Sequence, residues 1–252
     1  MLNSEIIFSN FFLLLQWLSK IKYMKTIGLL GGVSWHSTIE YYKNINKLVN
    51  KKLGGKNSAQ CIIYSVNFND ITSNAYKGNF KAIEELITNA CIKLEQSGAD
   101  CIGLCANTIH RFAEEVTHKI AIPIIHIADE TGKVLQKQNI SMAGLLGTKL
   151  TMEDEFYCNK LRNYGVEPMI PDEEDRKYIH NVILEELTQG IFKTETEKRV
   201  LSIIDKLQKC GAGGVILGCT EIPLLISQSN SSIPFFDTTI IHSKALVDFA
   251  LK

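Results

Sequence analysis

The chain alternates between two patterns of apolar and polar residues. In the first pattern, short apolar runs rich in β-branched residues are bounded by glycine, proline or polar residues. Such runs are typical of strands in a protein core. We therefore predict strands at 26–30, 61–66, 101–105, 122–127, 142–147, 166–170, 214–218 and 233–236.

In the second pattern, apolar residues recur three and four positions apart over longer stretches, which predicts amphipathic helices. We expect such helices at 80–98, 176–190 and 198–211, and each of these stretches ends on a glycine. Strands separated by helices favour parallel sheets, so the predicted fold class is α/β.

Three features of the first half of the chain recur in the second half in the same order. The pairs are IGLLGG and AGLLGT, SGADCIGLCANT and CGAGGVILGCTE, and IPIIHI and IPFFDT, each pair 111 to 116 residues apart. A repeat of this kind predicts two pseudo-symmetric α/β domains with parallel sheets. Ligands of such sheets bind beyond the carboxyl ends of the strands, so we expect the active site in the cleft between the domains. The predicted parts are an N-terminal extension at 1–23, a first α/β half at 24–128, a second at 129–232, and a strand and helix at 233–252 that pack back on the first half.

The N-terminal extension carries a strongly apolar run at 6–18. This run is too short to span a bilayer, and it lacks the basic flank and small-residue cleavage site of a secretory signal. A second methionine, Met24, stands directly before the first predicted core strand. We expect residues 1–23 to lie outside the core, with translation from an upstream start codon as one origin. The alternative is a helix that packs on the protein or lies on a membrane surface.

Composition narrows the classes of partner and compartment. The 252 residues include 27 basic and 27 acidic side chains, so net charge suggests neither a nucleic acid nor a stable membrane association. The seven cysteines form no CxxC pair, which disfavours a zinc site and a disulfide framework. Free thiols are typical of the reducing cytoplasm.

The stretch GCTEIP at 218–223 places a cysteine, a threonine and a glutamate after a predicted strand. A helix starting at Thr220 would place Cys219 near its positive end, which lowers the pKa of a thiol and makes it a better nucleophile or base. Thr220 and the backbone N–H groups suit a carboxylate, whereas Glu221 suits the proton of the thiol or a substrate amine. The alternative is a small buried cysteine with only a packing role.

The stretch CANT at 105–108 ends the corresponding strand of the first half. Counted from the Gly-Ala pair that precedes each of the two strands, Cys219 corresponds to Ala106 and not to Cys105. Neighbouring residues of a strand face opposite sides, so Cys105 is expected in the core with Cys101. We therefore predict one catalytic thiol.

Other polar residues follow the predicted strands. Asn107 and Thr108 offer an amide and a hydroxyl suited to a substrate carboxylate, and Thr148 ends the strand of the second half. The stretch GGVSWHST at 31–38 is a glycine turn with a capping-box pattern at Ser37, and it lacks the glycine spacing of nucleotide-binding loops. No HxH or HExxH spacing occurs among the six histidines, so no metal site is expected.

Taken together, the motifs resemble those of the aspartate/glutamate racemase family, and most closely its branch of aspartate racemases and broad-specificity amino-acid racemases. The resemblance extends from Met24 to the C-terminus and rests on KTIGLLGGVSWHSTIEYY, NSAQCIIYSV, ANTIH, IPIIHIADET, LLGTKLTMEDEFY and GVILGCTEIPLL.

This resemblance implies two pseudo-symmetric α/β domains, a homodimer, and catalysis without pyridoxal phosphate or metal. In the family two cysteines flank the α-carbon, and one removes its proton while the other reprotonates the opposite face. The second cysteine matches Cys219, but the position of the first is Ala106. The resemblance also implies that Val33 and Gln60 lie near the substrate. His36 stands where the branch commonly carries glutamate.

We therefore predict a cofactor-independent amino-acid racemase or a closely related isomerase, with Cys219 as the base or acid at the α-carbon. The expected ligand is an amino acid or a related carboxylic acid, whose carboxylate would be held by Asn107, Thr108, Thr148 and Thr220. Two alternatives remain: a decarboxylase or isomerase of small dicarboxylic acids that needs one thiol, and a non-catalytic protein that binds small acids.

Overall fold

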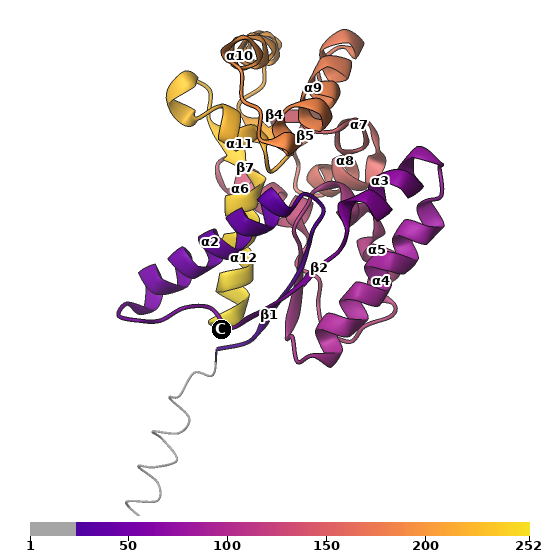
Figure 1. Cartoon of the computed structure of the whole chain (residues 1–252). Coiled ribbons are helices and arrows are strands. Elements are labelled where there is room, and N and C mark those ends of the chain that lie inside the picture. Colours follow the sequence, from indigo (N-terminus) through magenta and orange to yellow (C-terminus); the bar gives the residue numbers. More distant parts are fainter. Residues whose placement is uncertain (1–23) are drawn as a thin grey trace, which may run out of the picture.

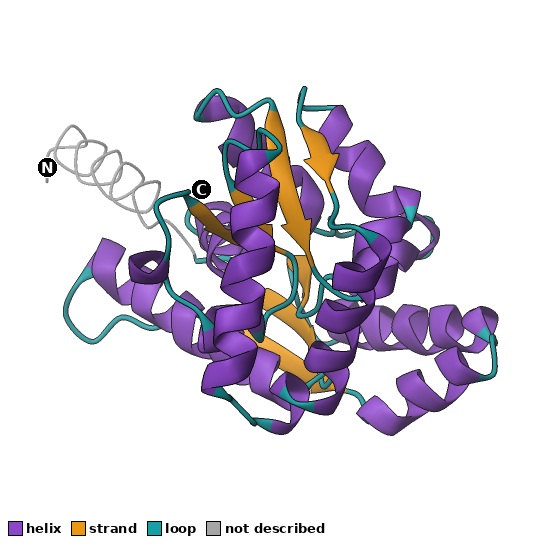
Figure 2. Ribbon diagram, turned by 90° about the horizontal axis from the view of Figure 1, so that it is seen from above, coloured by secondary structure: helices purple, strands orange, loops and turns teal. Residues whose placement is uncertain are grey.

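In the computed structural model, which describes residues 24–252, the chain forms two parallel β-sheets surrounded by helices (Figure 1). Seen from above, the strands lie inside the molecule with helices around them (Figure 2). The predicted α/β fold class with two parallel sheets is confirmed. The predicted extension at 1–23 lies outside the described residues.

The first sheet has the strand order β2-β1-β3, with β1 (Ile27–Gly31) in the centre, β2 (Cys61–Ser65) on one side and β3 (Cys101–Leu104) on the other. All residues of β1 and β3 are buried, because helices cover both faces of the sheet. One face packs against α2 and α12, and the other against α4, as Figure 1 shows.

The second sheet has the order β5-β4-β6-β7, and all its pairings are parallel. Its strands are β4 (Met142–Leu146), β5 (Glu167–Met169), β6 (Val215–Leu217) and β7 (Phe235–Asp237). Thus β1 and β4, which carry the repeated GLL segment, hold equivalent positions at the centre of the order β2-β1-β3 and of the order β5-β4-β6.

The helices of the first half are α2 (Trp35–Leu53), α3 (Phe68–Tyr76), α4 (Phe80–Gln96), the 3₁₀ helix η1 (Thr108–Phe112) and α5 (Ala113–Thr117). Those that follow are α6 (Ile127–Lys137), α7 (Lys149–Glu153), α8 (Glu155–Arg162), α9 (Glu173–Glu185), η2 (Leu187–Gln189), α10 (Thr194–Lys209), α11 (Ile222–Leu225), η3 (Gln228–Asn230) and α12 (Thr238–Ala250). Side-chain oxygens of asparagine or aspartate cap several helix starts, at Asn67, Asn79, Asp154, Asp172 and Asp237.

The segment 122–127, predicted as a strand, forms only an isolated parallel bridge between Ile102 and Ile124. The extended stretch is short because α6 begins at Ile127, and the side chain of His126 caps it by accepting a hydrogen bond from the backbone N–H of Ala128. This bridge nevertheless lies beside β3 in the place that β7 takes beside β6. The structural repeat therefore includes the segment 122–127 and β7.

The C-terminal segment 233–252, expected to pack on the first half, is divided between the two halves. β7 pairs with β6 in the second sheet, because its sequence continues the repeat and completes that sheet. α12 then crosses to the first half, where it packs against α2, β1 and β3, and it also contacts α6. Figure 1 shows it beside α2. This crossing connects the two halves. Within 24–252, no helix combines the length and the apolar character needed to cross a bilayer.

Candidate active site

A cavity of about 430 Å³ lies where the carboxyl ends of the strands from both sheets meet. Its walls include residues that directly follow β1, β3, β4 and β6. Those from the first half are Val33, Ser34, Phe68, Ile71, Thr72, Ala75, Tyr76, Ala106, Asn107, Thr108 and Ile109. Those from the second half are Thr148, Leu150, His180, Ile183, Leu184, Thr188, Gly218, Cys219, Thr220 and Glu221. The structure therefore brings together every predicted site residue except Gln60.

Gln60 lies at the other end of the first sheet. Its carbonyl accepts a hydrogen bond from the N–H of Ile27, at the amino end of β1, and its side chain is exposed. Because the cavity is at the carboxyl ends of the strands, the full length of β1 separates Gln60 from it. Gln60 therefore does not belong to the candidate site, and the expectation carried over by resemblance is wrong.

The turn that opens the cavity after β1 depends on a glycine. Gly32 has φ +86°, and a Cβ atom there would lie 2.0 Å from the carbonyl oxygen of Val66. Only glycine fits this close approach of two backbones. The turn carries Val33 and Ser34 to the cavity wall before α2 begins.

Cys219 follows β6 and is 7% exposed at the cavity wall. Its Sγ donates a hydrogen bond of 2.9 Å to Oε2 of Glu221. Glu221 is buried, and its carboxylate also accepts hydrogen bonds of 2.8 Å from Ser37 and from Thr220. Within 24–252, no lysine, arginine or histidine forms an ion pair with this carboxylate.

Ser37 joins the two halves at this carboxylate. The sequence predicted a capping box around Ser37, but α2 begins at Trp35, with Ser34 at the N-cap and no side-chain cap bond. Instead the Ser37 hydroxyl donates to Glu221 and also contacts the Thr220 hydroxyl across the interface between the halves. Sequence periodicity could not have identified this contact, because its partners are 184 residues apart.

The predicted low pKa of the Cys219 thiol is wrong for this arrangement. Burial raises the pKa of Cys219 well above its ordinary value, and the neighbouring Glu221 carboxylate raises it further. Hydrogen bonds from the backbone N–H groups of Glu221 and Ile222 oppose the shift but are smaller contributions. The expected helix start at Thr220 is replaced by a four-residue helix that begins at Ile222, too short for a strong dipole. The thiol is therefore protonated at rest, with a carboxylate in position to accept its proton.

On the first half, the structure separates Cys105 from Ala106. Cys105 is 1% exposed and packs with Cys101 and Tyr41 in the core between the sheet, α2 and α12, as strand alternation predicted. Burial raises the pKa of Cys105 far above its ordinary value. Ala106 lies in a different apolar cluster and lines the cavity. The wall of the first half therefore presents a methyl group in the position that corresponds to the Cys219 thiol.

Asn107 has a defined amide orientation. The hydroxyl of Thr238 donates to the carbonyl of Leu217, so it accepts from Nδ2 of Asn107 at 3.1 Å. The amide oxygen, Oδ1, is then buried without a hydrogen-bond partner among the described residues, as is Oγ of Ser34. Both residues line the cavity, so both oxygens are available to a ligand.

The hydroxyls of Thr108 and Thr148 meet across the two halves at 3.2 Å, and Thr148 continues to the hydroxyl of Thr151 at 3.2 Å. This row of hydroxyls can turn a donor toward a carboxylate, because hydroxyl protons rotate. Lys149, which follows Thr148, points elsewhere and pairs weakly with Glu153 at 3.9 Å. Lys149 is therefore an exposed surface charge.

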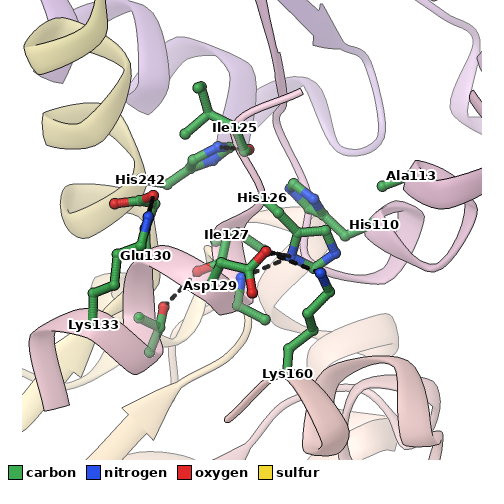
Figure 3. A network of polar contacts seen from close by, with 12 residues as sticks. His110, Ala113, Ile125, His126, Ile127, Asp129, Glu130, Lys133, Lys160 and His242 are labelled. Atoms are coloured by element: carbon green, nitrogen blue, oxygen red, sulfur yellow. Dashed lines mark hydrogen bonds and ion pairs between the residues drawn. The ribbon is translucent and has the colours of Figure 1, made fainter. Parts of the chain in front are cut away.

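A second polar cluster lies behind the Asn-Thr turn. Figure 3 shows the rings of His110, His126 and His242 close together, with Asp129 and Lys160 beside His126. Burial lowers the pKa of His126 to about 4 and that of His242 to about 3. His242 accepts from the Tyr41 hydroxyl and donates to the carbonyl of Ile125. These histidines are neutral core residues, and none of them lines the cavity of Cys219.

The described residues contain no cluster of three or more histidine, cysteine, aspartate or glutamate side chains suited to a metal ion. The chemistry available at the cavity wall is therefore a thiol paired with a carboxylate, two buried oxygens without partners, and a row of hydroxyls. This set can hold an ammonium and a carboxylate and can move a proton.

Comparison with known proteins agrees with this geometry. The Asp/Glu/hydantoin racemase family model matches residues 30–246. A Yersinia pestis protein with the provisional description Asp/Glu racemase is 43% identical, and the alignment covers 91% of this chain and 100% of that one with a TM-score of 0.85. An aspartate racemase homologue of Pyrococcus horikoshii is 33% identical, with the same coverage and a TM-score of 0.80. The broad specificity amino-acid racemase RacX of Bacillus subtilis is 24% identical over 224 residues, or 88% of this chain and 96% of that protein. The chain therefore belongs to the Asp/Glu/hydantoin racemase family.

Proposed function

We propose that the chain is an amino-acid racemase in which the Cys219 thiol, paired with the Glu221 carboxylate, transfers the α-proton. The observation that carries the proposal is the 2.9 Å hydrogen bond from Sγ of Cys219 to a buried carboxylate at the wall of a cavity between the halves. Membership in the racemase family supports the reaction class, an isomerisation. The carboxylate allows a thiolate to form without a helix dipole, because it can accept the proton of the thiol.

The charges at the wall support an amino acid as the ligand. Glu221 is a buried carboxylate with hydroxyl and thiol donors but no cationic partner among the described residues, and a substrate ammonium would supply one. The unpartnered Oδ1 of Asn107 is a second acceptor for the same ammonium. The hydroxyls of Thr108 and Thr148 are then suited to the α-carboxylate.

The proton moves in two steps. As Glu221 accepts the thiol proton, the thiolate of Cys219 takes the proton from the α-carbon, and the electron pair of the broken C–H bond delocalises into the substrate carboxylate. The carbanion is then reprotonated on the opposite face. Ala106 offers no proton there, so we propose that a water molecule donates it. The proton held by Glu221 then passes through solvent to the hydroxide that is left, which restores the resting site. In the reverse direction a water molecule first protonates Glu221, and the resulting hydroxide removes the α-proton. Cys219 then protonates the carbanion, and Glu221 returns its proton to the thiolate.

A decarboxylase of malonate-type acids also needs only one thiol, which agrees with Ala106. Its substrate carries two carboxylates and no ammonium, however, and would meet the buried Glu221 where residues 24–252 place no lysine or arginine at the cavity wall. Two anions beside a third in a buried site are strongly disfavoured. The racemase therefore agrees better with the charges than the decarboxylase does.

Exchange of the α-hydrogen tests this function. The protein is incubated with L-amino acids in deuterated water, and deuterium at the α-carbon and the D-enantiomer are both measured. Exchange that disappears in Cys219→Ser is the expected result. A folded protein that binds an amino acid but catalyses no exchange would instead be a non-catalytic binding protein.

We also propose that the protein is a homodimer and that it is located in a reducing compartment. All seven cysteines are free. Trp35, Ile39 and Tyr42 project from one face of α2, and each is about half exposed, which suits contact with a second copy. Light scattering of the purified protein tests the dimer, and cellular fractionation tests the cytoplasmic location.

A further inference from the structure

The outer part of the cavity differs from the part around Cys219, and this difference bears on the substrate of the proposed racemase. Most of the outer wall consists of apolar side chains from α3, α7 and α9: Phe68, Ile71, Ala75, Tyr76, Leu150, Ile183 and Leu184. The hydroxyls of Thr72 and Thr188 in the same wall donate to carbonyls of the preceding helical turn. Ile71 and Ile183 are buried, whereas Leu184 and Tyr76 lie exposed at the rim. A ligand whose α-carbon lies near Cys219 would therefore extend its side chain along apolar surface.

No lysine or arginine within 24–252 lines this cavity. Basic side chains on nearby elements are paired with carboxylates: Arg111 with Asp154 at 3.3 Å, Arg176 with Glu153 at 2.9 Å, and the exposed Lys149, more weakly, with Glu153 at 3.9 Å. The guanidinium of Arg111 also stacks over the ring of Phe80, away from the cavity wall. A second carboxylate on the substrate would thus find no cation.

His180 is the one imidazole at the cavity wall within the described chain. Burial lowers the pKa of His180, and the positive charge of Lys149 lowers it further, so the ring is neutral at pH 7. Its Nδ1 accepts a hydrogen bond from the backbone N–H of Lys149. His180 therefore offers one polar N–H to a ligand but no positive charge.

We propose that the substrate is an α-amino acid with an uncharged, apolar side chain, of the size of leucine, methionine or phenylalanine, and not aspartate or glutamate. This inference rests on the proposed function, because it assumes that the α-carbon lies at Cys219. An acidic side chain would lose its hydration in the cavity without a counter-charge, which is strongly unfavourable. A cationic side chain is disfavoured as well, since Glu153 and Asp154 near the outer wall already have arginine partners.

The test compares kcat/KM for α-hydrogen exchange with L-leucine, L-methionine, L-aspartate, L-glutamate and L-lysine. We expect the apolar amino acids to exceed the acidic ones by at least about a hundredfold, the scale on which buried sites discriminate against unpaired polar groups. Leu184→Arg, at the partly exposed rim, is expected to narrow this ratio at least about tenfold by supplying a cation. Leu53→Arg is the matched control, because Leu53 is similarly exposed but lies at the end of α2 outside the cavity, and it is expected to leave the ratio unchanged.

The outcomes separate this inference from the proposed function. Exchange that is fastest with aspartate, glutamate or lysine overturns the apolar class but leaves the racemase standing. If no amino acid exchanges, the racemase fails, and calorimetric titration of the wild type with L-leucine and L-aspartate decides the ligand class instead. Tighter binding of leucine then supports the apolar class, whereas tighter or equal binding of aspartate, or binding of neither, overturns it.

Discussion

The two half-sites after β3 and β6 are built on the same topology but carry different chemistry. In the second half, Cys219 donates to Glu221 beside the cavity. At the equivalent place in the first half stand the Ala106 methyl and the Asn107 amide, and the nearby thiol of Cys105 faces the core. The repeat thus preserves the backbone that presents a catalytic residue, whereas single positions determine whether each half supplies a proton. A two-sided reaction here would depend on one protein thiol and one water molecule.

Cys219→Ser is expected to have the largest effect. A serine hydroxyl is a far weaker acid than a thiol, so even beside Glu221 it does not provide the base. Exchange of the α-hydrogen should fall to the background rate while the thermal unfolding midpoint stays near that of the wild type. Exchange persisting near the wild-type rate would show that the second half-site is not the reactive one.

Glu221→Gln tests the pairing within the second half-site. The amide keeps the size of the side chain but cannot accept the thiol proton, so exchange at neutral pH should fall by about two to three orders of magnitude. The carboxylate also raises the pKa of Cys219, so its removal lowers the pKa of the thiol. We therefore expect the exchange rate of the variant to increase as the pH rises, because the Cys219 thiol then loses its proton to solvent. A pH–rate profile parallel to that of the wild type contradicts the pairing.

Ala106→Cys makes the two half-sites alike. If a water now protonates the face opposite Cys219, a thiol in its place should speed racemisation by about ten- to a thousandfold. The gain should at first be larger in the direction that the water limited, as initial rates for each enantiomer can measure. The equilibrium constant must stay at unity. A folded variant with no gain in either direction would mean that residue 106 does not face the α-carbon.

Cys105→Ala addresses the thiol that faces away from the cavity. We expect less than a tenfold loss of activity, with a decrease of about 1–2 kcal/mol in the free energy of unfolding from the smaller buried side chain. Denaturant unfolding and exchange assays on the same preparation separate the two effects. A loss of activity as large as that of Cys219→Ser, without loss of stability, would assign Cys105 to the reaction.

In the repeat, His126 stands where the second half carries Asp237, and the histidines behind the first half-site predict a pH dependence of stability. The pKa of His126 falls from its ordinary 6.5 to about 4 in the folded protein, so the unfolded chain binds the proton more readily. Neutral His126 therefore makes its full contribution to the free energy of unfolding above about pH 6.5. This contribution, on the order of 3 kcal/mol, is lost as the pH falls toward 4. His126→Asn keeps a cap for α6 but does not titrate, so its unfolding free energy should depend less on pH in this window. Identical pH dependence in the variant contradicts this assignment.

The sequence predicted several of these features for reasons that are local. Alternation along a strand was enough to separate Cys105 from Ala106, and spacing within the repeat was enough to pair Ala106 with Cys219. The bounds of β1 and β2 were predicted to within a residue, because buried strands have a clear apolar pattern. Gln60 was misplaced because the resemblance implied a role for it without showing where it lies along the sheet. In the structure it lies at the amino end of the first sheet, away from the cavity.

What the sequence alone determined is therefore the α/β class, the repeat and the set of residues at the strand ends, because these depend on periodicity and on short-range geometry. Only the tertiary structure decided the state of the reactive thiol. The pKa of Cys219 rises because the fold buries it beside Glu221, whose carboxylate is held by Ser37 from the other half of the chain. Only the tertiary structure, too, enclosed the cavity with apolar side chains of α3 and α9 and directed the nearby arginines to other carboxylates. Burial and long-range charge pairing depend on which distant segments meet, and no local pattern of residues encodes that.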